Sequence, residues 1–278
     1  LVAGVVSDFE VTEQMLKYFI DRVHNESFTL VPRPRVVIGI PSGVTEVEKR
    51  AVEDATFEAG AREVYLIEEP MAAAIGARLP IYDPKANLVV DIGGGTTEVA
   101  LICLGGVVAS RSLRVAGDKL NEDIVQYVKD ELRLLIGERT AEEIKMTVGS
   151  VWPQDENLEM DISGRDAVTG LPKEIKISSD EIRKALMRST RLIINAVKDT
   201  IEETPPELIS DLTKKAIHLA GGGSLIRGFD TLLAHETKLP VKIIDDPLTA
   251  VVRGCGIILE DIGKLKDVLV KTDKEEYQ

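Results

Sequence analysis

The sequence lacks the features that mark membrane-spanning and metal-binding proteins. No apolar run approaches the roughly 20 residues that a membrane-spanning helix needs. Cysteine is scarce, because only Cys103 and Cys255 are present, and neither has a CxxC partner or a histidine at metal-site spacing. We therefore expect both to be small buried apolar side chains in a protein of the reducing cytoplasm.

Positively charged residues are also fewer than negatively charged ones. The 34 Lys and Arg residues are outnumbered by 47 Asp and Glu residues, and the net charge is −13. Duplex binding draws most of its affinity from Lys and Arg that neutralise phosphates, so this balance argues against nucleic acid. It argues equally against electrostatic attachment to anionic lipid, and any membrane contact would have to be hydrophobic. The remaining composition, 278 residues with 44% hydrophobic and 29% charged, is typical of a globular protein of about two domains.

Residue patterning predicts an α/β protein. Between residues 11 and 77 helical and strand patterns alternate, which favours a parallel sheet covered by helices. Three apolar strands with glycine turns then predict an antiparallel meander. The expected helices are 11–23, 45–60 (opened by a Thr45–Glu48 capping box), 70–77, 120–135, 140–149, 180–203, 225–235 and 247–260. The expected strands are 36–40, 64–67, 88–90, 99–104, 107–115, 158–163, 174–178, 216–220 and 241–244.

Neither a P-loop nor a dinucleotide-binding GxGxxG motif occurs, but a glycine triplet follows the apolar strand 88–90. Gly93, Gly94 and Gly95 let the backbone approach an anion and turn its N–H groups toward it, and Thr96 adds a hydroxyl donor. Asp91, at the end of the strand, can hold a water molecule of a hydrated Mg²⁺. The alternative interpretation is a hairpin with a glycine turn and an acidic flank.

A second glycine triplet follows the predicted strand 216–220 and precedes the predicted helix 225–235. Gly221, Gly222 and Gly223, with Ser224, would aim the N–H groups of a helix start at a phosphate or a sugar. Tight turns also need glycine for steric reasons alone, so this triplet by itself leaves the two interpretations open.

Two further patterns contain candidate site residues. In Glu68–Glu69–Pro70 the acids precede a helix, where they complement its dipole, but Glu69 also stands where it can orient an attacking water. Glu142 and Lys145 lie three residues apart on a predicted helix and so share one face. They form either an exposed ion pair or contacts with a ribose or adenine edge.

Together these motifs resemble the ATPase superfamily of actin, sugar kinases and heat-shock chaperones, and within it the MreB family of rod-shape-determining bacterial actins. The matching runs occur in family order over nearly the whole chain. They are Pro41–Glu48, Ile67–Gly76, Val89–Ala100, Ile136–Lys145, Gly164–Pro172, Thr204–Leu208 and Gly221–Gly228.

The resemblance implies an actin-like (ribonuclease-H-like) fold with two lobes flanking a nucleotide cleft. Residues 1–84 and 253–278 would form the first lobe, 85–119 and 184–252 the core of the second, and 120–183 a small outer subdomain. It implies ATP and Mg²⁺ as cofactors, Glu69 as the hydrolytic residue, and Asp91, Gly93, Gly94, Gly95 and Thr96 as the second phosphate loop. Gly117 would line the ribose side, Glu142 and Lys145 would flank the nucleoside, and Gly221 to Ser224 would form the adenosine loop.

The resemblance also sets two limits. Gly4–Phe9 already matches the family's sequence after its first phosphate hairpin, and no second copy of the 91–97 pattern occurs. We therefore expect an incomplete first lobe, which leaves the ATPase activity of this chain uncertain. An inactive structural fragment is one alternative. A small-molecule kinase on the same fold is another, although the large insertion that such enzymes usually carry is missing.

Family members assemble into filaments on the inner face of the cytoplasmic membrane and work with the membrane-bound wall-elongation machinery. The resemblance implies these partners, and a peripheral cytoplasmic location, for this chain. Phe28 and Leu30 fall in a predicted loop similar to the family's membrane-inserting loop. The other interpretation is that they pack back onto helix 11–23.

Overall fold

The computed structural model describes residues 8–25 and 33–271. The predicted membrane loop with Phe28 and Leu30 lies outside these described residues. Within them, no helix is both long enough and apolar enough to cross a membrane.

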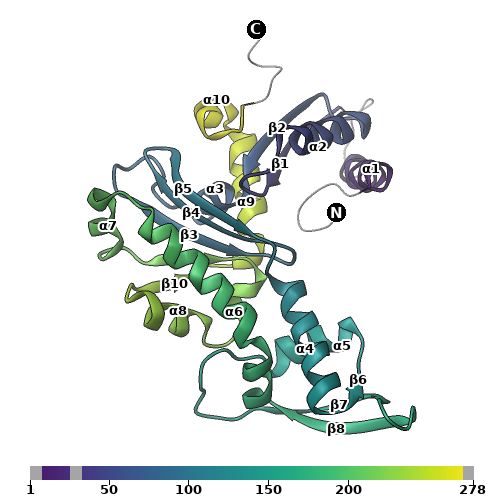
Figure 1. The fold of residues 1–278 in the computed structure, drawn as a ribbon. Coiled ribbons are helices and arrows are strands. Elements are labelled where there is room, and N and C mark those ends of the chain that lie inside the picture. The colour runs from purple at the N-terminus through teal and green to yellow at the C-terminus, as the bar shows by residue number, and fades with distance from the viewer. Residues whose placement is uncertain (1–7, 26–32, 272–278) are drawn as a thin grey trace.

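Three separate sheets, with helices around them, make up the described chain (Figure 1). The strands are β1 (Arg35–Ile40), β2 (Glu63–Glu68), β3 (Asn87–Ile92), β4 (Thr97–Cys103), β5 (Gly106–Leu113), β6 (Leu134–Leu135), β7 (Glu159–Asp166), β8 (Pro172–Ser178), β9 (Ile217–Ala220) and β10 (Val241–Ile243). The α-helices are α1 (Phe9–Asn25), α2 (Glu46–Glu58), α3 (Glu69–Gly76), α4 (Gly117–Glu131), α5 (Glu138–Val148), α6 (Ser179–Glu202), α7 (Pro206–Leu212), α8 (Phe229–Thr237), α9 (Ala250–Glu260) and α10 (Ile262–Leu265). Three single 3₁₀ turns are η1 (Gly222–Leu225), η2 (Pro247–Thr249) and η3 (Lys266–Val268).

The first sheet follows the sequence prediction closely. β1 and β2 pair in parallel, and α2 connects them. The predicted capping box opens α2, because the Glu48 amide donates to Thr45 Oγ1 at 3.3 Å and the Thr45 amide donates to Glu48 Oε2 at 2.7 Å. These two reciprocal bonds satisfy amides that a helix start otherwise leaves without a partner.

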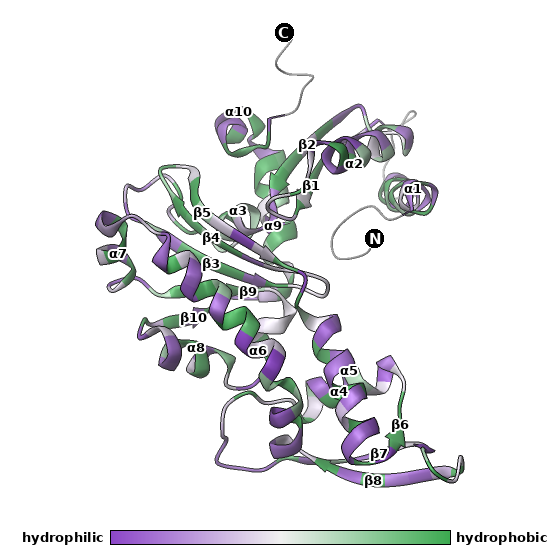
Figure 2. Cartoon of the chain, viewed as in Figure 1, coloured by the Kyte–Doolittle hydropathy of each residue, from purple (hydrophilic) through white to green (hydrophobic). Residues whose placement is uncertain are grey.

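A five-stranded sheet in the order β10-β9-β3-β4-β5 forms the centre of the molecule. β3, β4 and β5 make the predicted antiparallel meander, whereas β9 runs parallel to both β3 and β10. β3 and β4 are buried along their whole length, and their ribbons are largely in the hydrophobic colour (Figure 2). Such burial on both faces indicates a middle layer covered on each side by helices.

Successive strand residues face opposite sides of this sheet, so β3 contributes to two cores. Leu88, Val90 and Ile92 belong to a first core with α4, α5, α6 and α8. Val89 belongs to a second core with α3 and α9. The sheet is thus the layer that the two cores share, with α6 across its front in Figure 1 and α3 and α9 behind it.

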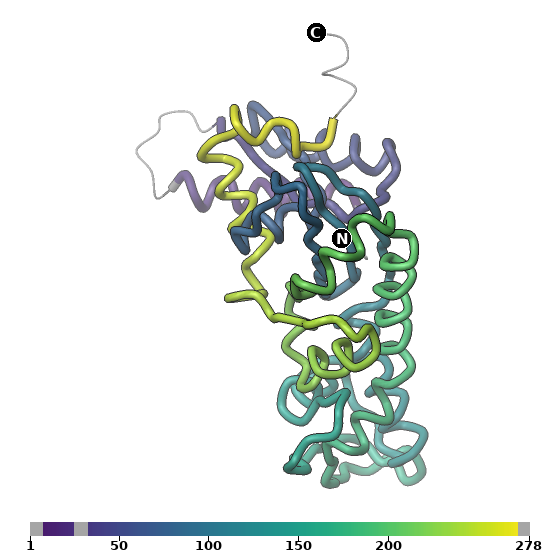
Figure 3. The backbone as a smooth tube through the Cα atoms, turned by 90° about the vertical axis from the view of Figure 1, so that its left-hand side faces the viewer, coloured from purple at the N-terminus to yellow at the C-terminus, as the bar shows by residue number. Residues whose placement is uncertain are grey.

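The third sheet, β6-β7-β8, closes the end of the molecule beyond α4 and α5, at the bottom of Figures 1 and 3. β7 and β8 form the predicted polar pair. The predicted helix 120–135 was too long, because α4 ends at Glu131 and Leu134–Leu135 form β6, opposite Arg165 and Asp166 on β7. Only that long-range pairing makes these two leucines a strand.

The predicted helix 225–235 was wrong at its start. Gly222–Leu225 form the single turn η1, and Ile226 then leaves the helical region with ψ 129°. Gly228, with φ 76°, precedes α8, which begins at Phe229. The long helix predicted to begin at 247 is likewise a 3₁₀ turn followed by α9.

The apolar face predicted for residues 11–23 is largely exposed on α1. Met15, Phe19 and Val23 are 37%, 53% and 68% exposed, whereas Leu16 and Ile20 are partly buried. In the described part of the chain α1 packs mainly against α2. One neighbouring helix covers only part of an apolar stripe that is more than 100° wide.

Candidate functional site

Both glycine loops lie at the same edge of the central sheet. β3 and β9 are parallel neighbours with Asp91 opposite Ala220, so the loops that follow them leave the sheet side by side. Gly221 has φ 77°, and a Cβ there would overlap the carbonyl oxygen of Ile92. The carboxyl ends of adjacent parallel strands are where α/β proteins bind ligands.

Steric need accounts for two glycines of the second loop. Gly221 lies in the left-handed region, and a Cβ at Gly223 would overlap the side chain of Ile92. The Ser224 hydroxyl donates to the Gly221 carbonyl at 2.7 Å and is therefore engaged within the turn. These contacts favour the tight-turn interpretation for this loop. The loop nevertheless lies beside the first glycine loop.

Gly94 in the first loop is different. Its φ is not in the left-handed region, and a Cβ there would meet only the Asp118 carboxylate, at an ordinary 3.6 Å. Among the described residues, no backbone carbonyl accepts from the amides of Gly94 or Gly95. Packing therefore does not require glycine at 94, and the loop leaves open backbone of the kind that cradles anions.

The start of α4 holds this loop in place. The Gly117 amide donates to the Gly93 carbonyl at 3.0 Å, and the Asp118 amide donates to the Gly94 carbonyl at 2.8 Å. A Cβ at Gly117 would lie 3.2 Å from the Gly93 carbonyl oxygen. Gly117 is thus the point of close approach between α4 and the loop, and the loop carbonyls cap the positive end of the helix.

Lys145 on α5 also reaches this region. Its Nζ donates to the Gly117 carbonyl at 3.0 Å, rather than forming an ion pair with the exposed Glu142. Burial lowers the pKa of Lys145, although Glu142 and Asp118 partly offset that effect. The predicted exposed ion pair is therefore absent from the described residues, and Lys145 is a partly buried cation beside the loop.

Three carboxyl groups from three elements gather behind the loops. Glu69 begins α3, Asp91 is the next-to-last residue of β3, and Glu98 lies on β4 directly opposite Asp91. Burial raises the pKa of each to about 7. The charge of Asp91 further raises the pKa of Glu69, that of Glu98 raises the pKa of Asp91, and that of Glu69 raises the pKa of Glu98.

Glu98 was missed in the sequence analysis. It is only 1% exposed and accepts the Ser42 amide at 3.1 Å and the Ser112 hydroxyl at 2.7 Å. The Ser42 hydroxyl donates in turn to Glu68 at 2.9 Å, so a buried carboxylate connects the first sheet to the central one. A single acid inside the otherwise apolar strand 97–103 was the available signal, since such residues are almost never buried without a partner.

No cluster of three or more metal-ligating side chains occurs among the described residues. Mg²⁺ does not require one, because it keeps several of its waters and takes only one or two carboxylates from a protein. Asp91 is largely buried, but its carboxylate lies next to Gly221 of the second loop, and it can make such a contact through water. Thr96 is buried and its side chain bonds Glu98, so its hydroxyl is already engaged.

The fold is that of the actin-like proteins. The model of the MreB/Mbl protein family matches residues 1–267, and the chain belongs to this family.

Two relatives and a solved structure illustrate the similarity. The cell shape-determining protein MreB of Escherichia coli K12 is 50% identical over 259 residues, which cover 93% of this chain and 74% of that protein. The cell shape-determining protein Mbl of Bacillus cereus is 47% identical over 262 residues, covering 94% and 78%. The crystal structure of Spiroplasma citri MreB5 bound to ADP superposes with a TM-score of 0.90 at 40% identity, covering 95% of this chain and 79% of that one.

Proposed function

We propose that this chain binds Mg-ATP at the two glycine loops and serves as a membrane-associated filament protein that organises wall elongation and maintains rod shape. The observation that carries the proposal is Gly94, a glycine that neither backbone conformation nor packing requires. The S. citri relative is also known bound to AMPPNP, an imido analogue of ATP, which supports a nucleotide in the same place.

In this proposal Gly94 and Gly95 bind phosphate oxygens through their amides, and Asp91 contacts Mg²⁺ through water. Gly93 shapes the loop, because its own amide donates to the Thr96 carbonyl at 2.9 Å. When bound, the metal neutralises phosphate charge. Gly117 and Lys145 border the ribose side, with Glu142 at the exposed rim. The adenosine loop is Gly221 to Ser224, whose backbone the turn described above already fixes.

Glu69 has the properties of a residue that orients and deprotonates a water molecule. Its pKa is raised to about 7, so near neutral pH it is partly ionised and able to accept a proton. Its carboxyl has no hydrogen-bond partner among the described residues, which leaves it free for a water. The proton that it takes would be shared within a group that already includes Asp91 and Glu98.

The proposed division into lobes follows the three sheets. Residues 1–84 and 253–278 contain β1 and β2, residues 85–119 and 184–252 the five-stranded sheet, and residues 120–183 the third sheet. The boundary at 253 falls inside α9. We propose that closure of the lobes on Mg-ATP favours self-assembly in the cytoplasm, at the inner face of the membrane and beside the wall-elongation proteins.

The test is a calorimetric titration with Mg-ATP. We expect one-site binding, weakened about tenfold or more by Gly94→Ala because a methyl group would narrow the open loop. Gly263→Ala is the matched control, since a Cβ at Gly263 meets nothing within 4 Å. Glu69→Gln should bind but not turn over ATP. A wild-type chain that binds no Mg-ATP would contradict the proposal.

Assembly and membrane contact are tested by sedimentation. The chain should pellet with ATP alone, and should co-pellet with neutral liposomes in the absence of assembly. Changing Phe28 and Leu30 together to Asp should abolish co-pelleting with liposomes and preserve pelleting with ATP. Undiminished co-pelleting of that variant would remove the membrane role from this loop.

A further inference from the structure

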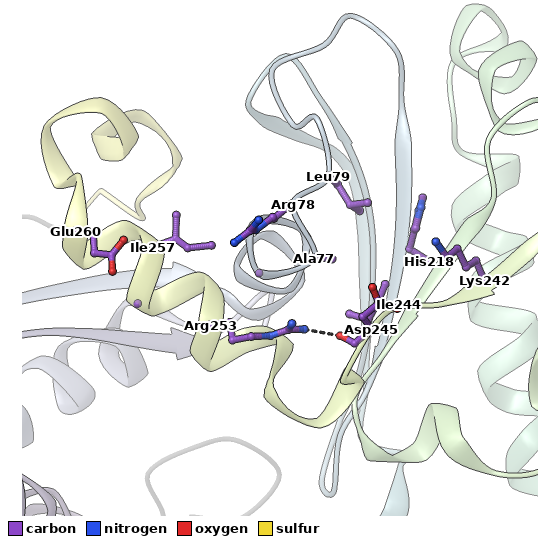
Figure 4. Close-up of a pocket in the computed structure, with 12 residues that line it drawn as sticks. Ala77, Arg78, Leu79, His218, Lys242, Ile244, Asp245, Arg253, Ile257 and Glu260 are labelled. Carbon is purple, nitrogen blue, oxygen red and sulfur yellow. Dashed lines mark hydrogen bonds between the residues drawn. The ribbon is translucent and has the colours of Figure 1, made fainter.

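A cavity lies at the opposite end of α3 from Glu69, where the helix meets β9, β10 and α9 (Figure 4). Its volume is about 560 Å³, within the range of small-molecule sites. Because α3 has eight residues, the two ends are on the order of 12 Å apart. None of the residues that line this cavity belongs to the glycine loops.

Three cationic side chains from three different segments line the cavity. Arg78 follows α3, Lys242 lies on β10 and Arg253 lies on α9, with His218 of β9 next to Lys242 (Figure 4). In a chain of net charge −13, such a group is unexpected. Asp245 and Glu260 also line the cavity, but within the described residues no ion pair joins either one to these cations.

The hydrogen bonding of these cations is incomplete. Arg253 donates through Nη2 to the carbonyls of Asp245 at 2.5 Å and Asp246 at 3.1 Å, so it contacts only backbone acceptors. The described residues contain four buried side-chain atoms without a partner, and two of these, Arg253 Nε and His218 Nδ1, belong to residues of this cavity. Buried polar groups are nearly always satisfied, so two unpartnered atoms are unusual, but both are closed off from the cavity, and a ligand would contact Arg253 through its outer guanidinium nitrogens.

Arg78 is in an unusual conformation for its residue type. After α3, the Leu79 amide donates to the Ala74 carbonyl and the Arg78 amide to the Ile75 carbonyl, both at 2.9 Å. These two bonds define a helix end at which glycine is the favoured residue at position 78. An arginine stands there instead, with φ 56°. The left-handed conformation is unfavourable for a residue with a Cβ, and Arg78 shares it with Arg133 after α4 and Lys238 after α8.

We propose that this cavity binds a small oxyanion ligand, whose phosphate or carboxylate group is held by Arg78, Lys242 and Arg253. Two guanidinium groups and one ammonium group from separate segments suit an anion with several oxygens. Such a ligand would also connect α3 and α9 to the edge strand β10. The proposal is independent of nucleotide binding, because its residues and those of the loops do not overlap.

The test uses the histidine signals of the full chain in NMR spectra, titrated at constant pH with inorganic phosphate and, separately, with citrate. The chain has only three histidines, His24, His218 and His235. We expect a saturable shift of the His218 ring signals alone. The probe that saturates at the lower concentration identifies phosphate or carboxylate as the preferred chemistry.

Variants locate the site and guard against unfolding. Arg78→Gly should weaken binding at least tenfold while folding at least as stably, because glycine suits the left-handed position. Lys242→Ala should also weaken it. Arg133→Gly is the matched control, an exposed arginine with φ 55° after α4, and should bind as wild type does. A static His218 signal with both probes into the millimolar range, or equal binding by Arg78→Gly and Arg133→Gly, would overturn the proposal.

Discussion

Three largely buried carboxyl groups, those of Glu69, Asp91 and Glu98, share one small region and repel one another. Each comes from a different element, so the repulsion acts between α3, β3 and β4. Ser42 and Ser112 offset part of it through hydrogen bonds to Glu98. A concentration of raised pKa values of this kind is typical of sites where protons or cations are handled.

Ionisation of these carboxyl groups should make the protein less stable as the pH rises from 5 to 8. A carboxyl with a pKa of about 7 when folded and about 4 when unfolded binds its proton more tightly in the folded state. The protonated carboxyl therefore stabilises the fold at low pH, and this stabilisation is lost as the pH rises from about 4 to about 7, by at most about 1.4 kcal/mol per pH unit for each group. Thermal unfolding at stepped pH measures this change.

Glu98→Gln isolates the effect. It keeps the shape of the side chain without its charge, so the variant should show a flatter pH dependence and exceed the wild type in stability at pH 8. His218 acts in the opposite direction, because burial lowers its pKa, but it is unchanged in the variant. Parallel pH profiles for the two proteins would show that Glu98 does not titrate in this window.

Among the secondary-structure elements, those with local signals were the ones that the sequence predicted well. The capping box at Thr45 and the apolar strands 88–90 and 99–104 need only neighbouring residues to be recognised, and all three are confirmed. β6 and the start of α8 depend on distant partners or on the left-handed Gly228, so periodicity alone could not place them.

In the candidate site, too, the features with local sequence signals were predicted and those that depend on long-range packing were not. Glycine loops and an acid before a proline are visible in a sequence, and Gly94 and Glu69 were identified in this way. Two other contacts depend on how α5 and β4 pack. Lys145 donates to the Gly117 carbonyl, and Glu98 lies opposite Asp91. Both contacts join residues whose proximity only the folded chain creates. The roles assigned to these residues in nucleotide binding stay predictions.

The crossing of α3 and α9 fixes the position of Glu69 and gives a prediction at the scale of elements. A Cβ at Gly254 of α9 would overlap the Ala72 carbonyl of α3. Gly254→Ala must therefore push the helices apart, and should lower the free energy of unfolding by about 2–4 kcal/mol. Denaturant unfolding measures the loss.

The same helix supplies the control. A Cβ at Gly256 meets nothing within 4 Å, so Gly256→Ala should be neutral or should stabilise by about 0.5–1 kcal/mol through helix propensity. If both variants lost stability equally, close approach of the two helices would not be the reason for glycine at 254.

At the scale of the whole molecule, the central sheet determines how its parts are coupled. β3 contributes Leu88, Val90 and Ile92 to the first core and Val89 to the second, so neither core can be lost while the other keeps its strands intact. The nucleotide site proposed here lies at the edge of that sheet. The oxyanion cavity lies on the side of the second core, where α3 and α9 meet β10.

This shared sheet predicts that the two cores unfold together. Trp152, the only tryptophan, packs against the first core, whereas Gly254 lies in the helix crossing of the second. In Gly254→Ala the midpoint temperature followed by Trp152 fluorescence should therefore fall as far as the midpoint followed by far-UV circular dichroism. Unequal shifts, with the fluorescence midpoint staying at its wild-type value, would mean that α3 and α9 detach from an intact sheet. In that case the position of Glu69 would depend on a helix pair that moves independently of Asp91 and Glu98.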